Sequence, residues 1–245
     1  MPSIPGFSDP LSSLTHFAGA FAFAWLGLSL VRRGRGSRSR TLSLVVFAAS
    51  CVLLLSISGA YHLLQPESAA KQVLRRLDHA AIFILIAGSF TPVHVILFRG
   101  PWRWGVLAGI WTMAITGLTL KLVYFASMPE WLGLALYLGF GWFGLITGGA
   151  LARRFGWRFV GPLVWGALAY TLGALADFLH WPAPLPGIVG PHEVFHLAVL
   201  AGIAWHWTFV LSIARGEMPD RSAEPRADAS SIAGRVLIQR GSAPF

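Results

Sequence analysis

The sequence predicts an all-α integral membrane protein, folded as a bundle of seven transmembrane helices. Three observations lead to this fold class. Of the 245 residues, 55% are hydrophobic and only 12% are charged, whereas a soluble domain carries about 25% charged residues. Seven apolar segments follow one another, each close to the ~20 residues that a helix needs to cross the hydrocarbon core. The single cysteine, Cys51, lies within one of these segments, which excludes an internal disulfide and a cysteine-based metal cluster.

The segments are rich in Leu, Ala, Gly and Phe, a composition typical of helices that pack closely in lipid. The predicted spans are Leu14–Val31, Thr41–Leu64, Ala80–Phe98, Trp104–Phe125, Trp131–Ala152, Phe159–His180 and His192–Ala214. The first has no basic leader and no small-residue cleavage site, so we interpret it as a span and not as a removed signal peptide. Residues 1–214 therefore form one transmembrane domain, and the polar residues 215–245 are predicted to be a flexible tail.

With seven spans, the connections alternate between two membrane faces. Side A holds the start of span 1 and the connections between spans 2 and 3, 4 and 5, and 6 and 7; side B holds the others and the tail. Of nineteen Lys and Arg residues, ten lie in the side B connections and five in the tail, against four on side A. The positive-inside rule then places side B in the cytoplasm. The basic residues behind the net charge of +9 therefore indicate the membrane orientation and are expected to contact anionic lipid headgroups. Nucleic acid is not expected as a partner.

Polar residues that are costly inside a membrane gather at side A. They are His16, Ser58, His62, Asp78, His79, Asp177, His180, His192, Glu193 and His196. Ionisable residues in membrane segments usually serve function, so this one-sided cluster predicts a site. Structural roles are the alternative: His16, His79 and His180 as hydrogen-bonded buried groups, and Asp78 as an ion-pair partner of Arg75 or Arg76. For Ser58, the alternative is a hydrogen bond from its hydroxyl to a backbone carbonyl of its own helix. For Asp177, the alternative is a position that faces the membrane–water interface.

The spacing of the histidines favours a metal site. His192 and His196 are four residues apart and share one helix face, and His62 ends span 2 at the same membrane depth. Three neutral imidazoles that leave one coordination position open are the ligand set of a catalytic zinc, which activates a bound water. Asp78 is then a candidate general base or water-orienting group. Ser58, one helical turn before His62, is a candidate hydrogen-bond donor to the water or to a developing oxyanion.

Four stretches together resemble the hemolysin III branch of the progestin and adipoQ receptor family. They are "THFAGA" in span 1, "SISGAYHLL" with S-x-x-x-H, "RRLDHAAIFILIAGSFTP" with Asp-His, and "HEVFHLAVLAGIAWHW" with H-x-x-x-H. The resemblance extends over roughly residues 14 to 212. It implies a seven-helix bundle with one zinc near one membrane face, held by His62, His192 and His196, with Asp78 and Ser58 beside the bound water. It also implies the bacterial cell membrane as location.

Two classes of function follow from this resemblance. The related alkaline ceramidases favour a zinc-dependent hydrolase of lipid amide or ester bonds, whose substrate enters from the bilayer near side A. The related adiponectin receptors favour a receptor or a sensor of membrane state in which zinc is structural. The adiponectin receptors also imply that the zinc end faces the cytosol, opposite to the orientation that the charge count gives.

A metalloprotease is the third interpretation, because His192 to His196 also match H-E-x-x-H. A metzincin would need Gly and His where the chain has Val199 and Gly202. A membrane-embedded protease of the site-2 type would need an Asp downstream, whereas Asp78 lies far upstream. We therefore assign no catalytic role to Glu193, which is expected either to reach the interface or to support a metal ligand.

Overall fold

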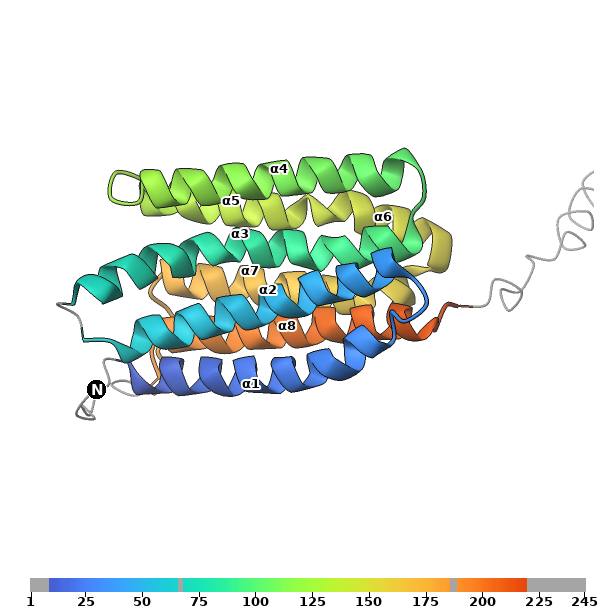
Figure 1. Ribbon diagram of the computed structural model, residues 1–245. Coiled ribbons are helices and arrows are strands. Elements are labelled where there is room, and N and C mark those ends of the chain that lie inside the picture. The colour runs from blue at the N-terminus through green and yellow to red at the C-terminus, as the bar shows by residue number, and fades with distance from the viewer. Residues whose placement is uncertain (1–8, 66–67, 186–188, 220–245) are drawn as a thin grey trace, which may run out of the picture.

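A computed structural model describes residues 9–65, 68–185 and 189–219 of the chain. In these ranges the chain forms α-helices joined by short connections (Figure 1). The helices are α1 (Pro10–Arg32), α2 (Arg38–Leu63), α3 (Ala69–Leu97), α4 (Pro101–Val123), α5 (Glu130–Trp142), α6 (Gly144–Phe155), α7 (Trp157–Phe178) and α8 (Pro191–Arg215).

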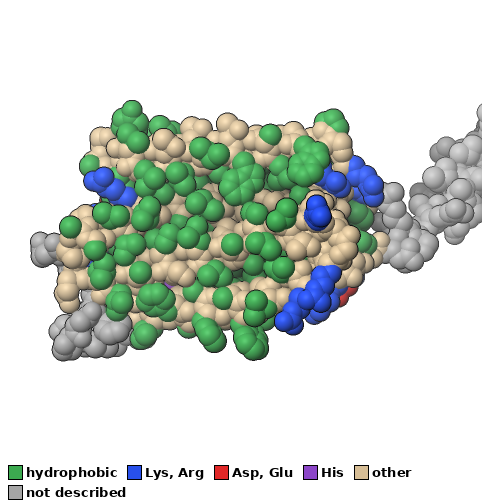
Figure 2. Space-filling view, viewed as in Figure 1, with side chains coloured by type: hydrophobic (Ala, Val, Ile, Leu, Met, Phe, Trp, Pro, Cys, Tyr) green, Lys and Arg blue, Asp and Glu red, His purple; other side chains and the backbone are tan. Residues whose placement is uncertain are grey.

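When α5 and α6 are taken together as one segment, the described residues contain seven helical segments that are long and apolar enough to cross a membrane. Large apolar side chains point outward from the bundle, among them Phe21, Trp25 and Trp165. Figure 2 shows hydrophobic side chains along the whole length of one face, while Lys and Arg side chains lie at its two ends. This distribution is that of a surface solvated by lipid in the middle and by water at the ends. The predicted seven-helix membrane bundle is therefore confirmed.

The bundle places helices side by side that are neighbours in the sequence and helices that are distant in it. α1 packs against α2 and α8, α3 contacts both α2 and α8, and α7 lies along α8. In the interior of the bundle, the rings of Phe23 and Phe47 pack against Trp207 at centroid distances of 5.0 and 5.3 Å. Because α2 ends and α8 begins at the same end of the bundle, side A, this packing brings the end of one helix beside the start of the other (Figure 1).

The start of α3 differs from the prediction, since the helix begins at Ala69 rather than near Ala80. The Ser68 side chain caps it by accepting a hydrogen bond of 3.2 Å from the Lys71 backbone N–H. Hydropathy locates the membrane boundary and not the helix boundary, and the Lys and Arg residues of this stretch are good helix formers. As a result, Asp78 lies inside α3 and is held on a rigid element instead of opening a span.

The fifth span is broken once, at Phe143, which separates α5 from α6. Gly139, Gly141 and Gly144 surround the break, and each glycine costs a helix about 1 kcal/mol relative to alanine. α8 ends at Arg215, where Gly216 takes a left-handed conformation with φ of 79°. The predicted polar tail begins at this point, and its residues 220–245 lie outside the described part of the chain.

Candidate metal centre

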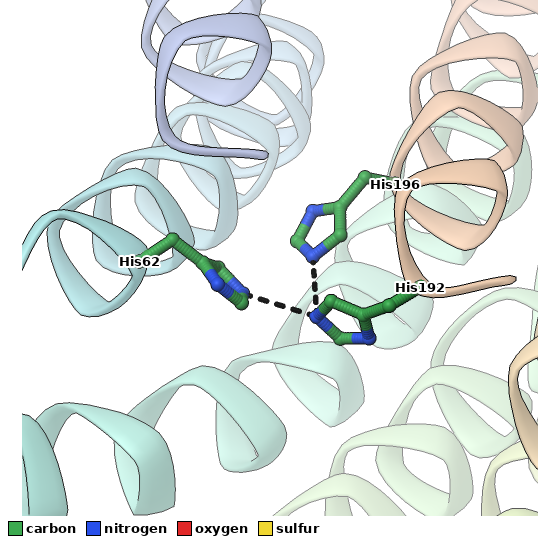
Figure 3. A group of neighbouring side chains, drawn as sticks. All are labelled: His62, His192 and His196. Atoms are coloured by element: carbon green, nitrogen blue, oxygen red, sulfur yellow. Dashed lines mark hydrogen bonds between the residues drawn. The ribbon is translucent and has the colours of Figure 1, made fainter. Parts of the chain in front are cut away.

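The three histidines of the S-x-x-x-H and H-x-x-x-H motifs converge at side A. His62 lies in the last turn of α2, and His192 and His196 lie in the first two turns of α8. Figure 3 shows the three rings pointing toward one another from the two helices. Nε2 of His192 lies 3.3 Å from Nε2 of His62 and 3.0 Å from Nε2 of His196. The three side chains offer ligand atoms within 4.8 Å of one another and could hold a metal ion.

The outer nitrogens of two of these rings are bound to carboxylates. His62 Nδ1 lies 3.1 Å from Asp9 Oδ2, just ahead of α1, and His192 Nδ1 lies 3.0 Å from Asp177 Oδ1, at the end of α7. Since a carboxylate can only accept, each Nδ1 carries the proton and donates it. The Nε2 atoms of His62 and His192 therefore present lone pairs to each other. The hydrogen bond from His62 also lowers the pKa of the Asp9 carboxyl, which keeps it ionised at neutral pH.

Two lone pairs that face each other at 3.3 Å repel each other unless a proton or a metal ion lies between them. Zn–N bonds of about 2.0–2.1 Å at tetrahedral angles place neighbouring nitrogens about 3.3 Å apart. The observed separations of 3.0 and 3.3 Å are close to this value. The donor set thus fits a small divalent ion that prefers imidazole ligands, as zinc does.

His196 is buried, like His62, with 2% of its surface exposed. Its Nδ1 lies 2.8 Å from Nε2 of His16, on α1, and the two rings are in edge contact at a centroid distance of 4.1 Å. His16 is equally buried, and its Nε2 also lies 3.4 Å from the His196 carbonyl oxygen. His16 therefore contacts the back of one of the three histidines, away from the point where the Nε2 atoms meet.

Glu193 has a structural position that the sequence did not predict. Its carboxylate accepts a hydrogen bond of 2.9 Å from the Gly190 backbone N–H, ahead of α8, and lies 3.4 Å from the Ser12 hydroxyl of α1. With 4% of its surface exposed, it does not reach out to the interface. Because it caps the helix that carries His192 and His196, Glu193 fixes the first turn of α8.

Asp78 and Ser58 lie beside each other, on α3 and α2. Ser58 is buried one turn before His62, and the Asp78 side chain is 15% exposed. Asp78 Oδ2 lies 3.9 Å from Nδ1 of its neighbour His79, and in the described residues no arginine nitrogen lies within 4.0 Å of it. The alternative of an ion pair with Arg75 or Arg76 is therefore not seen. Asp78 is not part of the group that could hold a metal, and its carboxyl is hydrogen-bonded to Ser58.

Besides His16, two further side A histidines lie outside the group. His79 Nδ1 lies 2.8 Å from the Arg75 carbonyl oxygen. His180 is exposed, and its Nδ1 lies 3.1 Å from the Phe178 carbonyl oxygen. A carbonyl oxygen can only accept, so in both cases the ring nitrogen donates. His79, which is partly buried, thus has the structural role of a hydrogen-bonded group, whereas His180 is hydrogen-bonded but exposed.

Sequence reasoning missed Asp9 altogether and left His16 and Asp177 undecided. Asp9 precedes the first apolar segment, so no hydropathy pattern includes it. The available signal was its place in "DPLSSLTH", seven residues ahead of His16 at the start of span 1. An acidic residue next to a histidine cluster often accepts a hydrogen bond from an imidazole N–H.

The sequence is similar to that of known protein families over most of its length. A family model described as haemolysin-III related matches residues 7–207. The chain belongs to the haemolysin-III-related family. This match includes all three converging histidines, together with Asp9, Ser58 and Asp78. The resemblance drawn from the motifs is thereby confirmed.

Relatives within and beyond this haemolysin-III group extend the comparison. The chain is 31% identical to Hemolysin-3 of Bacillus cereus over 202 residues, which is 82% of the chain and 89% of that protein. It is 27% identical to a Hemolysin-3 homolog of Bacillus subtilis over 79% of the chain and 88% of that protein. An adiponectin receptor protein of Drosophila melanogaster is 28% identical over 79% of the chain and 48% of its own length. These relatives link the haemolysin-III group to the adiponectin receptors.

The position of the histidines on two helices predicts that a bound metal stabilises the bundle. His62 and His192 are 130 residues apart in the chain, so an ion between them joins α2 to α8. An ion that binds only the folded state adds about 2.7 kcal/mol at a free concentration one hundred times its Kd. We expect a lower melting temperature after chelation and full recovery on return of zinc, measured by thermal unfolding in detergent with metal content determined in parallel. An unchanged melting curve after verified metal loss would contradict a joining role.

Proposed function

We propose that this protein is a zinc-dependent hydrolase that cleaves an amide or ester bond of a membrane lipid in the bacterial cell membrane. The observation that carries the proposal is the convergence of three imidazole Nε2 atoms at one membrane face, with a carboxyl and a hydroxyl beside each other on the neighbouring helices. The membrane location of the site favours a lipid substrate over a soluble one.

The chain supplies three kinds of group for such a reaction. When bound, zinc would polarise a carbonyl and lower the pKa of a coordinated water toward neutrality. His62, His192 and His196 would hold it, and no further His, Cys or carboxylate belongs to their group in the described residues, which leaves a coordination position for water or substrate. Asp78 would take the proton of the attacking water. The Ser58 hydroxyl would donate a hydrogen bond to the developing oxyanion.

The lipid would reach the site laterally, from the bilayer. The substrate's carbonyl would lie near side A while its acyl chain remains among the apolar side chains of the bundle surface. By the positive-inside rule, the Arg-rich connections of side B face the cytoplasm and the centre faces the outer leaflet. Two of the relatives come from Bacillus species, in keeping with a bacterial cell membrane.

The test is an acyl-lipid hydrolysis assay on the purified protein in detergent or liposomes, with ceramide-like amides and acyl esters as substrates. We expect turnover that falls with zinc content on chelation and returns on reloading. A protein that holds one zinc per chain and cleaves none of these lipids would contradict the hydrolase.

A receptor with a structural metal is the second candidate. It is favoured by the position of the three ligands on α2 and α8, where an ion joins distant helices, and by the similarity to a protein named adiponectin receptor. The same hydrolysis assay separates the two candidates, because a structural ion stabilises the bundle without any turnover.

A further inference from the structure

We propose that Asp9 and Asp177 are positioning residues of the metal centre: each carboxylate fixes one histidine so that its Nε2 faces the ion. Asp9 thereby makes the N-cap of α1 a part of the centre. The inference rests on the proposed binding of a metal by the three histidines, and it assigns a role to two residues outside the motifs.

Asp9 contacts the first histidine at two points. Its backbone N–H donates to the His62 carbonyl oxygen at 3.1 Å, and its Oδ2 accepts from His62 Nδ1 at 3.1 Å. The backbone contact fixes where Asp9 lies relative to the last turn of α2. The side-chain contact then fixes the rotation of the imidazole about its own axis and also which nitrogen carries the proton.

Asp9 is itself held in place from a third helix. Lys71 of α3 lies with Nζ 3.7 Å from the same Oδ2 atom and donates to the Leu64 carbonyl oxygen at 3.0 Å. Its ammonium also lies 5.2 Å from the centre of the Tyr61 ring. The carboxylate is therefore fixed between the end of α2 and the start of α3. A ligand whose supporting group is itself fixed loses little rotational freedom when it binds an ion.

Asp177 has the equivalent position at the second histidine, from the opposite side. Its Oδ1 lies 3.0 Å from His192 Nδ1, and both side chains are more than 40% exposed. The His62–Asp9 pair is less exposed to solvent, since the His62 side chain is only 3% exposed. A hydrogen bond with a charged partner is stronger where water is excluded, so the effect of Asp9 should exceed that of Asp177.

The two supporting carboxylates have a common electrostatic consequence. An imidazole that donates to a carboxylate is a more basic ligand at its other nitrogen, and removal of such a partner typically costs 10–100-fold in metal affinity. Two anionic carboxylates that contact the outer nitrogens of neutral histidines also offset part of the charge of a divalent ion. This predicts an effect on affinity and not only on folding.

A purely structural role is the alternative, since Asp9, the N-cap of α1, also joins α1 to the end of α2. The two roles differ in the metal-free protein. A structural contact stabilises the bundle whether or not an ion is present. A positioning residue changes the affinity for the ion and the geometry around it, and it leaves the stability of the metal-free protein nearly unchanged.

The experiment compares Asp9→Asn, Asp9→Leu and Asp177→Asn with the wild-type full chain in detergent. Glu130→Gln is the matched control, because Glu130 is an exposed carboxylate at the same side, at the start of α5. Zinc affinity is measured by competition with a chelator, the environment of the ion by the visible absorption of the Co²⁺-loaded protein, and stability by melting of the metal-free protein.

We expect zinc to bind roughly tenfold more weakly to Asp9→Asn and up to about 100-fold more weakly to Asp9→Leu. The amide oxygen of Asn can still accept from Nδ1, whereas Leu cannot. Asp177→Asn should show a smaller loss and Glu130→Gln none, and the Co²⁺ spectrum should change in both Asp9 variants. Unchanged affinity and spectrum in Asp9→Leu, or a fall in metal-free stability that accounts for the whole effect, would overturn the inference. A wild-type chain that binds no zinc would instead remove the metal centre itself.

Discussion

Replacement of His62 or His196 by Ala is expected to remove zinc from the purified protein. Each of these residues supplies one of three Nε2 atoms, and two nitrogens in a membrane-embedded site cannot complete the coordination that four-coordinate zinc requires. Loss of a direct ligand should cost more than the 10–100-fold that follows loss of a supporting carboxylate. Metal analysis should give about one zinc per chain for the wild type and almost none for either variant.

His180→Asn is the control for this experiment. His180 is an exposed histidine at the same membrane face, and its φ of 55° is one that Asn tolerates. It should keep the wild-type zinc content. If His62→Ala and His196→Ala both retain full occupancy, the ion is not bound where the three rings converge.

The second large effect is expected for Asp78, in comparison with Glu193. Asp78→Asn should lose about 10²- to 10⁴-fold of the lipid-amide hydrolysis rate, the usual cost of removing a general base, and should still bind zinc because Asp78 is not part of the histidine group. Glu193→Gln should keep most of the activity. Its carboxylate is engaged with the Gly190 N–H and the Ser12 hydroxyl, and the amide oxygen of Gln can still cap the helix.

The assay is hydrolysis of acyl-amide lipids in detergent or liposomes, with zinc content measured on the same samples. Glu193→Gln should also show a modest loss of stability, within the 0.5–2 kcal/mol typical of a helix cap, which serves as a check that the substitution acts on α8. An inactive Glu193→Gln beside a fully active Asp78→Asn would favour the metalloprotease interpretation of H-E-x-x-H.

The fold could be predicted because lipid solvation imposes a simple rule on sequence. Every residue of a spanning helix must be compatible with lipid or with another helix, so seven apolar segments were visible without any knowledge of packing. Hydropathy could not find the start of α3 at Ala69, because Lys71 and Arg75 are helical but polar. Nor could it find the break at Phe143, because the residues directly before and after it are apolar or glycine and continue the hydrophobic segment.

The site was predictable to the extent that its geometry is local. His192 and His196 share one turn of one helix, so their spacing alone places both rings on one face. The partner from α2 followed from the alternation of spans. Asp9, His16 and Asp177 contact the histidines through positions that only the packing of α1 and α7 determines. No periodicity contains that information.

The division of the histidines between α2 and α8 also bears on how the protein is made. The two helices are separated by 130 residues between His62 and His192, and synthesis proceeds at about 5–20 residues per second. For roughly 6–26 s after α2 has been made, the nascent chain holds one histidine of the three. A metal ion that needs all three histidines could therefore bind only after the last helix has been inserted. A chain that ends before Pro191 would reach the membrane as six apolar spans without its ion. The completed protein would then draw its metal from whichever compartment faces side A at that moment.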